Sequence, residues 1–306
     1  MGKNGGRGNK SIGGSMKVSI VIPNWNGAEK LRKNLPVVLQ VKGVDEVVVS
    51  DDGSTDNSIE VLEKEFPQVK LVKRQAQGGF STNVNFGVSN ASGELIFLLN
   101  SDAVPEIDCL QQVLKHFKDE NVFSVGCNVG GNWSWAKWEK GFFWHFESLE
   151  KTDGPHQTLW ASGGSMVFKK STWDELKGFD ECFNPFYEED VDLGYRAIKR
   201  GYISIFEPKA RVEHYKEPGV IEENYSKSTV AKTAQRNQLF LIWKNIHDPK
   251  MIKEHQKALI KILLTQPKYW RIFLKALVKL PRILEERKIE QKSTKLSDKE
   301  ILEKYG

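Results

Sequence analysis

The first hundred residues alternate between short apolar runs and longer amphipathic segments. Four runs rich in valine, isoleucine and leucine are typical of buried strands, over residues 18–22, 47–50, 69–72 and 95–99. Three segments between them are typical of helices, over residues 29–39, 56–66 and 83–89. Apolar strands that alternate with helices form parallel sheets covered on both faces. The pattern therefore predicts a Rossmann-like α/β fold with a mostly parallel sheet.

Polar side chains follow three of the predicted strands. Pro23-Asn24-Trp25-Asn26 comes after the first strand, Asp51 to Asp56 after the second, and Asn100-Ser101-Asp102 after the fourth. Ligands of open α/β sheets bind beyond the carboxyl ends of the strands. We therefore expect the three clusters to line one binding site.

The acidic residues of these clusters have two interpretations each. Asp51 and Asp52 suit a turn with a helix cap, and two adjacent carboxylates at a strand end also suit hydrogen bonds to a ribose hydroxyl or a base N–H. A single aspartate such as Asp102 is usually a turn former. It is also placed where a divalent cation would bridge it to a diphosphate, because such cations bind carboxylate and phosphate oxygens.

A second acidic cluster, Glu188-Glu189-Asp190, lies much later in the chain. Acids at the start of a helix are favoured by the helix dipole, and Asp192 is spaced to pair with Arg196. Three neighbouring carboxylates also raise one another's proton affinity, which suits a general base. The cluster is therefore a helix start, a catalytic base, or both.

Two further segments have both a structural and a functional interpretation. Gly163-Gly164 precedes an apolar run and is typical of a turn, while the absence of side chains would also let a ligand approach. Residues 132–146 hold four tryptophans and three phenylalanines, too many aromatic rings for an exposed loop. They predict either a satellite core or a platform on which sugar rings or lipid chains stack.

The basic residues are concentrated near the C-terminus. Residues 256–284 contain seven lysines or arginines and no acid, which exceeds the net charge of +5 of the whole chain. Five of these cations are spaced as one stripe on a helix whose other positions are apolar: Lys268, Arg271, Lys275, Lys279 and Arg282. This pattern predicts an amphipathic helix that either packs on the main domain or lies on an anionic membrane surface.

Composition narrows the class of protein. With 306 residues, 39% hydrophobic and 28% charged, the chain is long and apolar enough for a sizeable core. Basic residues confined to one segment argue against nucleic acid as a partner. Three widely spaced cysteines and no long apolar run indicate a cytoplasmic protein without a membrane span. Residues 1–15, rich in glycine, are expected to be a flexible leader or a tag.

Six segments together resemble the family 2 glycosyltransferases, which have the GT-A fold. In chain order they are IPNWNG, VVVSDDGSTDNS, GGFSTNVNFG, LLNSDAVP, ASGGSMVFKK and GFDECFNPFYEEDVDLGYRAIKRGY. The resemblance extends over about residues 17–243 and is similar to the bacterial rhamnosyltransferase subgroup. It implies a nucleotide-diphosphate sugar as donor, Mn²⁺ or Mg²⁺ as cofactor, and inversion at the anomeric carbon.

The resemblance also implies roles for individual residues. Asp51 is expected to read the base, and the donor-binding set is Pro23, Asn24, Asp51, Asp52, Asn85, Gly87, Ser101 and Asp102. Asp102 and His214 are the implied metal ligands, with Asn100 in place of the first aspartate of the family's DXD motif. Asp190 is the implied catalytic base with Glu189 in reserve. The implied acceptor-binding residues are Gly163, Gly164, Trp160 and Glu188.

We therefore expect three parts: a leader over 1–15, a GT-A domain over 16–245, and a basic amphipathic helical segment over 246–306. The expected activity is transfer of a sugar to a glycan or polyprenyl-linked acceptor in bacterial cell-envelope polysaccharide synthesis, at the inner face of the plasma membrane. One alternative is a sugar nucleotidyltransferase, which would favour a Gly-rich basic loop after the first strand that PNWNG lacks. The other is a catalytically degenerate scaffold, which has no need of Asp102, Asp190 and His214.

Overall fold

A computed structural model describes residues 16–214, 221 and 224–306 of the chain. Its N-terminal half contains the four predicted strands, which pair in parallel in the order β3-β2-β1-β4. Their bounds are β1 Val18–Asn24, β2 Glu46–Asp51, β3 Lys70–Lys73 and β4 Leu95–Leu99. Every residue of β4 is buried, as expected for a strand with helices on both faces.

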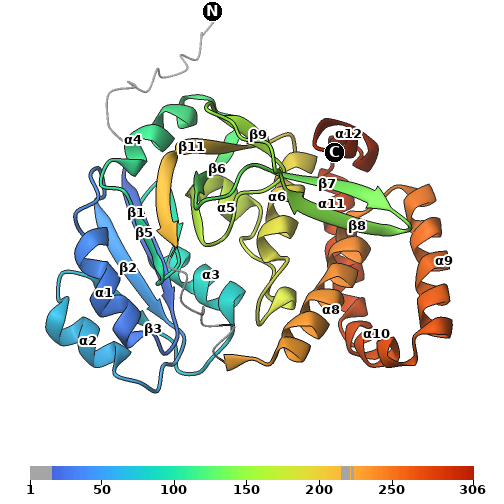
Figure 1. Ribbon diagram of the computed structural model, residues 1–306, viewed down its shortest axis with the longest axis horizontal. Coiled ribbons are helices and arrows are strands. Elements are labelled where there is room, and N and C mark those ends of the chain that lie inside the picture. Colours follow the sequence, from blue (N-terminus) through green and yellow to red (C-terminus); the bar gives the residue numbers. More distant parts are fainter. Residues whose placement is uncertain (1–15, 215–220, 222–223) are drawn as a thin grey trace, which may run out of the picture.

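Helices cover both faces of this parallel half (Figure 1). The predicted helices are present with bounds shifted by up to three residues, as α1 Ala28–Val38, α2 Ser58–Glu65 and α3 Phe80–Asn90. Leu31 and Val61 of α1 and α2 belong to one buried cluster with Ile20 of β1, whereas Val84 of α3 belongs to another with Val21. Successive residues of β1 thus point to opposite helix layers.

The sheet continues through strands that the sequence analysis left unassigned. These are β5 Ala103–Pro105, β6 Val122–Asn128, β9 His156–Thr158, β10 Ser165–Lys169 and β11 Ile203–His214. β10 is antiparallel to both β4 and β6, and β11 runs parallel to β6 and antiparallel to β5. Three short helices accompany this half: α4 Cys109–Leu114, α5 Lys170–Glu175 and α6 Glu189–Lys199.

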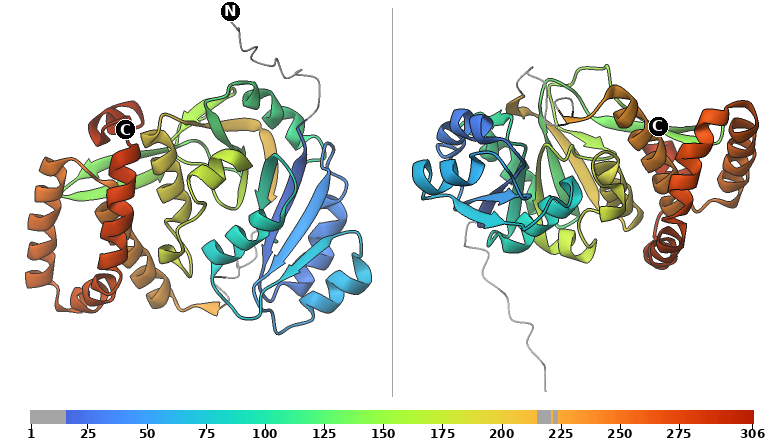
Figure 2. Two further views of the ribbon diagram at one scale, coloured as in Figure 1. Left: turned by 180° about the vertical axis from the view of Figure 1, so that it is seen from behind. Right: turned by 90° about the horizontal axis from the view of Figure 1, so that it is seen from below.

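A hairpin and a group of C-terminal helices form a second body of structure beside the sheet (Figure 2). The hairpin consists of β7 Ser134–Glu139 and β8 Phe142–Glu147, and the helices are α8 Lys227–Asn245, α9 Pro249–Thr265, α10 Trp270–Leu277, α11 Leu280–Ser293 and α12 Asp298–Lys304. One buried cluster joins Phe143 of the hairpin, Tyr195 of α6, Phe240 of α8 and Ile272 of α10. The satellite core expected among the aromatic residues is thus present on one face of the hairpin.

The prediction of a single basic helix over residues 256–284 is wrong. A turn of 3₁₀ helix at Pro267–Tyr269 separates α9 from α10, and Pro281 lies in the first turn of α11. Proline removes a backbone donor and clashes with the preceding turn, so it breaks a helix or starts a new one. The five cations of the predicted stripe are therefore distributed over three helical segments and the turn between the last two.

The segment after residue 245 is tied into the rest of the fold. Lys199 of α6 forms a buried ion pair with Asp298 of α12 at 2.8 Å, and Tyr195 Oη donates to the same carboxylate at 2.8 Å. Arg200 pairs with Glu290 of α11 at 2.9 Å. Losing one partner of a buried pair leaves an uncompensated charge, so these contacts hold the C-terminal helices against α6. Within the described residues no helix is both long and apolar enough to cross a bilayer.

Candidate active site

The ends of β1, β2 and β4 form one wall of a cavity of about 360 Å³, which we call the sheet-edge pocket. Predicted residues that line it are Pro23, Asn24, Asp52, Ser101, Asp102, Gly163, Gly164, Glu189 and Asp190. The parallel register sets Asn24 beside Asp51, and the amide of Asn83 donates to the carbonyl oxygens of Asn24 and Ser50 at 3.2 and 2.9 Å. The convergence predicted for the three polar clusters is therefore observed.

Asp52 is the most completely bound side chain of this pocket. Its carboxylate accepts hydrogen bonds from the backbone of Gly78 and Gly79 at 2.9 Å each and from Arg74 Nε at 2.9 Å. The residue is 3% exposed, and burial raises the pKa of its carboxyl although all three donors oppose that shift. Asp52 therefore fixes the loop before α3 at the mouth of the pocket.

The role expected for Asp51 is corrected. Asp51 is fully buried and does not line the pocket; its oxygens accept from Asn24 Nδ2 at 2.8 Å and from the backbone and hydroxyl of Ser54 at 2.9 and 2.6 Å. It organises the turn behind the wall. The carbonyl oxygen of the Asn24 side chain is buried and has no hydrogen-bond partner among the described residues. That oxygen, rather than Asp51, is the group at this wall that still requires a donor.

Asn85 and Gly87 are packing residues, not donor contacts, and neither lines a described pocket. The side chain of Asn85 donates to the carbonyl of Phe179 at 2.8 Å and accepts from its amide at 3.0 Å. A Cβ on Gly87 would lie 2.7 Å from Val21 and 3.0 Å from Ser50, so glycine allows α3 to approach the sheet. Both residues position α3 and thus act behind the site.

The residues that follow β4 are the ones expected to hold a divalent ion. Asp102 and Ser101 line the pocket, and the backbone of His214 at the end of β11 pairs with Ala103, next to Asp102. The His214 side chain is outside the described part of the structure. The described residues contain no group of three metal-ligating side chains. One carboxylate fits Mg²⁺ or Mn²⁺ bound largely by diphosphate oxygens and water, so the donor set suits a shared ion.

Asp190 stands at the start of α6 and faces the pocket. Its carboxylate accepts from the backbone of Gly163 at 3.0 Å and of Val191 at 2.8 Å. The preceding residues Tyr187 and Glu188 have φ of 72° and 75°, a left-handed backbone that non-glycine residues rarely adopt. Such conformations persist where the surrounding structure enforces them, often at functional sites. The turn aims the acids into the cavity.

The three acids differ in environment. Burial raises the pKa of Glu189 well above its ordinary value, and the charges of its acidic neighbours raise it further. Burial also raises the pKa of Asp190, but its two backbone donors and the charge of His145 oppose this. Two coupled acids whose surroundings separate their pKa values suit an acid and a base. The surroundings therefore favour the protonated form more strongly at Glu189 than at Asp190.

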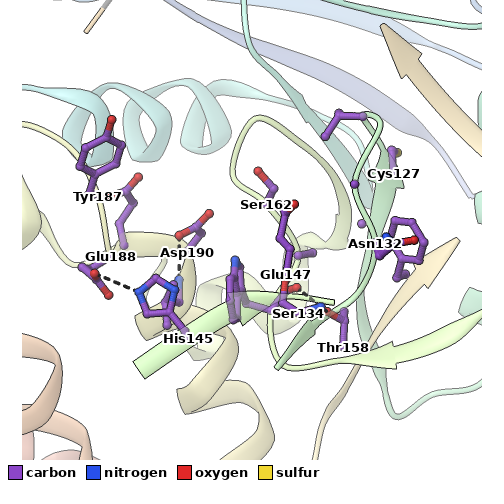
Figure 3. Close-up of a pocket in the computed structure, with 18 of the residues that line it drawn as sticks. Cys127, Asn132, Ser134, His145, Glu147, Thr158, Ser162, Tyr187, Glu188 and Asp190 are labelled. Atoms are coloured by element: carbon purple, nitrogen blue, oxygen red, sulfur yellow. Dashed lines mark hydrogen bonds and ion pairs between the residues drawn. The ribbon is translucent and has the colours of Figure 1, made fainter. Parts of the chain in front are cut away.

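Asp190 also lines a second cavity, of about 410 Å³ (Figure 3). We call it the hairpin pocket because His145 and Glu147 of β8 line it together with Trp160 and Glu188. Ser162, Tyr187, Glu189 and Asp190 line both pockets. Two glycines that line the sheet-edge pocket have structural roles. The backbone N–H of Gly163 donates to Asp190, and a Cβ on Gly164 would lie only 2.8 Å from the side-chain amide of Asn100.

Comparison with known proteins identifies the family. Residues 19–176 match the family model described as "Glycosyl transferase family 2". The chain belongs to this family. It is 33% identical over 184 residues to chondroitin synthase from Pasteurella multocida, covering 58% of this chain and 18% of that one. It is 26% identical over 209 residues to N-acetylglucosaminyl-diphospho-decaprenol L-rhamnosyltransferase from Mycobacterium tuberculosis, covering 56% and 66%. The chain thus spans less than two thirds of either relative.

Solved structures define the fold of this family 2 chain. A crystal structure of GalNAc-T7 with UDP, GalNAc and Mn²⁺ aligns with a TM-score of 0.62 at 15% identity, over 83% of this chain and 57% of that chain. The mannosyltransferase PcManGT from Pyrobaculum calidifontis, in complex with GDP-Man and Mn²⁺, aligns with 0.55 at 16%, over 91% and 85%. The fold is GT-A, as the resemblance implied, and the likeness to bacterial rhamnosyltransferases is also confirmed.

Several site residues of this family 2 glycosyltransferase lie outside the predicted set. Phe80 and Tyr225 line the sheet-edge pocket, and His145 lines the hairpin pocket. Asn237 of α8 is fully buried, and its amide nitrogen lies 2.7, 2.9 and 2.9 Å from the carbonyl oxygens of Phe183, Phe186 and Tyr187. Asn237 therefore supports the left-handed turn before Asp190. Asn237 lies within the polar stretch Gln235-Arg236-Asn237-Gln238, so no sequence signal marks this role.

Proposed function

We propose that this chain is an inverting glycosyltransferase that moves a sugar from a nucleotide-diphosphate donor to a hydroxyl group of a glycan or lipid-linked acceptor. The observation that carries the proposal is the position of Asp190 in the wall shared by two pockets. A transferase that joins two substrates directly needs one site for each, with the base between them. We assign the donor to the sheet-edge pocket and the acceptor to the hairpin pocket.

The sheet-edge pocket has the chemistry of a nucleotide site. The unpartnered Asn24 oxygen offers an acceptor for a base N–H or a ribose hydroxyl, and the aromatic rings of Trp25 and Phe80 offer apolar faces. Asp102 lies at the end of the same wall, where we place the diphosphate. Mg²⁺ or Mn²⁺ held there by Asp102, with His214 as the second proposed ligand, would neutralise charge on the leaving diphosphate.

In the proposed reaction, the two substrates meet beside Asp190. The acceptor hydroxyl oxygen attacks the anomeric carbon from the side of the hairpin pocket, forming the new glycosidic bond. The bond from that carbon to the diphosphate oxygen breaks, and its electron pair leaves with the nucleoside diphosphate. The hydroxyl proton passes to the carboxylate of Asp190. Attack and departure on opposite faces invert the anomeric centre. Glu189, held protonated, keeps a second negative charge away from the base.

We further propose that the acceptor is presented at an anionic membrane surface. Leu264 and Val278, from α9 and the turn after α10, are 77% and 78% exposed. Exposed cations lie among them, at Lys257, Lys261, Lys268, Arg271, Lys275, Lys279 and Arg282. In Figure 1, α10 and the carboxyl end of β1 lie at the same edge of the molecule. Support also comes from the relative whose name describes a decaprenol-linked substrate. Cell-envelope polysaccharide synthesis at the inner face of the plasma membrane fits this arrangement.

The proposal is tested by a screen of nucleotide sugars with UDP-, GDP- and dTDP-linked donors. The full chain should hydrolyse at least one donor slowly in the presence of Mn²⁺ or Mg²⁺, and transfer its sugar to an added glycoside with inverted anomeric configuration by NMR. Asp108→Asn, at an exposed carboxyl that lines neither pocket, is the matched control for Asp190→Asn. Absence of binding and hydrolysis across all donors would exclude the function. Retention of anomeric configuration would exclude the mechanism.

A further inference from the structure

His145 is a titratable side chain that the reaction described above does not use. The register of the hairpin pairs it with Ala136, and its neighbours on the same face of β8 are Phe143 and Glu147. Phe143 packs in the second core, whereas His145 and Glu147 reach the hairpin pocket (Figure 3). The hairpin thus inserts one histidine opposite the acids of α6.

The contacts of His145 point to Glu188. Its Nε2 lies 3.1 Å from Glu188 Oε1, and its ring meets the edge of Trp160 at a centroid distance of 5.1 Å. Burial alone would lower the pKa of His145, but the hydrogen bond to Glu188 and the charges of Glu188 and Asp190 raise it. Its cross-strand neighbour on β7, Ala136, is neutral, and Glu147, two residues further along the same face of β8, is a third nearby acid. His145 therefore forms an ion pair with Glu188 in its protonated state.

One carboxylate oxygen of Glu188 lacks a hydrogen-bond donor among the described residues. Its side chain is 9% exposed, yet Oε2 has no hydrogen-bond partner among the described residues. Buried carboxylate oxygens without donors are rare, because each costs the free energy of its lost hydration. Glu188 lines the hairpin pocket two residues from Asp190. A ligand that supplies a hydroxyl donor beside the reacting hydroxyl would satisfy it.

We propose that His145 is a positioning residue for the acceptor: it orients Glu188 so that Oε2 accepts a hydrogen bond from a sugar hydroxyl adjacent to the one that Asp190 deprotonates. This inference rests on the proposed function and specifies its acceptor as a pyranose with a free hydroxyl next to the linkage position. Glu188 touches the substrate, and His145 acts through it. A hydrogen bond to a charged group gives roughly tenfold or greater discrimination.

The test measures transfer to p-nitrophenyl glycosides of glucose, galactose, N-acetylglucosamine and rhamnose, and to their monodeoxy analogues. His145→Gln should raise KM for the best glycoside about tenfold, with a smaller change in kcat. Removing the adjacent hydroxyl from the glycoside should cost the wild type about tenfold and the variant little, which is the signature of a coupled pair. Lys137→Gln, on the opposite face of the same hairpin, is the matched control and should behave as wild type.

The pH dependence provides a readout that a merely structural histidine would not change. As pH rises through the raised pKa of His145, its charge is lost and the acceptor KM of the wild type should rise; His145→Gln should show no such rise. An unchanged KM in His145→Gln, equal discrimination of the deoxy glycoside, or a pH response that persists in the variant would overturn the inference. If His145→Gln does not fold, Glu188→Gln breaks the same pair and must raise KM. Failure of the wild type to bind any donor refutes the proposed function instead.

Discussion

The two pockets beside Asp190 are built from different kinds of sequence information. One wall of the sheet-edge pocket consists of loops that directly follow β1, β2 and β4, and the parallel register brings their side chains together. The hairpin pocket combines β6, β8, the turn before β10, the start of α6 and α8. Its shape depends on the second core, to which the C-terminal helices contribute. Local motifs thus determine the sheet-edge pocket, and tertiary packing determines the hairpin pocket.

The pockets also differ in how far their acids are satisfied. Asp52 on the sheet-edge side has three donors on its carboxylate. Glu188, which lines the hairpin pocket, and Glu189, which lines both pockets, each keep an oxygen without a partner among the described residues. A saturated carboxylate holds structure, whereas an unsatisfied one gains most from a ligand. We infer that the sheet-edge pocket is preorganised and that the hairpin pocket is completed by its substrate.

The largest effect is expected at Asp190, one of the residues that line both pockets. Asp190→Asn keeps a side-chain acceptor for the backbone of Gly163 or Val191 but cannot take a proton, so transfer should fall by roughly 10²–10⁴-fold. Donor affinity, measured by titration calorimetry, should change little because the sheet-edge pocket is formed without the proton-accepting function of Asp190. Glu189→Gln preserves the neutral form of that side chain and should cost far less. Normal transfer by Asp190→Asn with loss in Glu189→Gln would reverse the two assignments.

The next effect concerns the metal and the donor side alone. UDP or GDP at 100 times its Kd with Mn²⁺ should stabilise the fold by about 2.7 kcal/mol, and a chelator should remove most of this if the ion is shared between Asp102 and the diphosphate. Asp102→Asn should show the same loss without chelator, and Asp108→Asn should not. The measurement is thermal unfolding. Equal stabilisation with and without chelator would separate Asp102 from any metal.

The sequence predicts the residues of the sheet-edge pocket better than those of the hairpin pocket. The strand ends at Asn24, Asp52 and Asp102 were predicted because they follow apolar runs directly. The resemblance implied the base-reading role for Asp51, and two adjacent aspartates at a strand end do not by themselves say which one faces the cavity. In the structure Ser54 and Asn24 bind Asp51 internally. A one-residue ambiguity on a strand inverts the face of every side chain.

The acceptor side was predicted less completely, for a physical reason. His145 was one of eight aromatic or histidine residues in a dense segment, and only the pairing of β7 with β8 shows that it faces α6. Asn237 gave no motif at all, since its role depends on carbonyl groups about 50 residues earlier in the chain. The helical spacing of the C-terminal cations was real, but Pro267 and Pro281 divided the predicted helix.

A buried amide provides a test of the tertiary link to the acceptor side. Asn237→Ala removes the donors from the turn that holds Tyr187 and Glu188, leaving buried carbonyl groups unpaired, and should destabilise the fold by about 1–3 kcal/mol. Gln235→Ala, exposed on the same helix, is the control. Urea unfolding gives the stability. Acceptor KM in Asn237→Ala should rise more than donor KM; equal changes in both would contradict the separate construction of the pockets.

The smallest effect for a single substitution is expected on the exposed face of α9 and α10. Each cation near an anionic leaflet contributes about 1 kcal/mol, so Lys275→Gln should weaken binding to phosphatidylglycerol-containing vesicles about fivefold, and salt should weaken it further. Leu264→Ser combined with Val278→Ser should weaken binding to these vesicles too, because both side chains are more than three-quarters exposed. Leu149→Ser, a 98% exposed leucine outside this face, is the matched control. Co-sedimentation measures the binding.

Because the face belongs to the helices that support the hairpin pocket, these variants should lose transfer to a lipid-linked acceptor in vesicles and retain donor hydrolysis in solution. Equal binding of the wild type to anionic and neutral vesicles would show that the cations serve solubility, and would remove the membrane from the proposed function while leaving the chemistry at Asp190 intact.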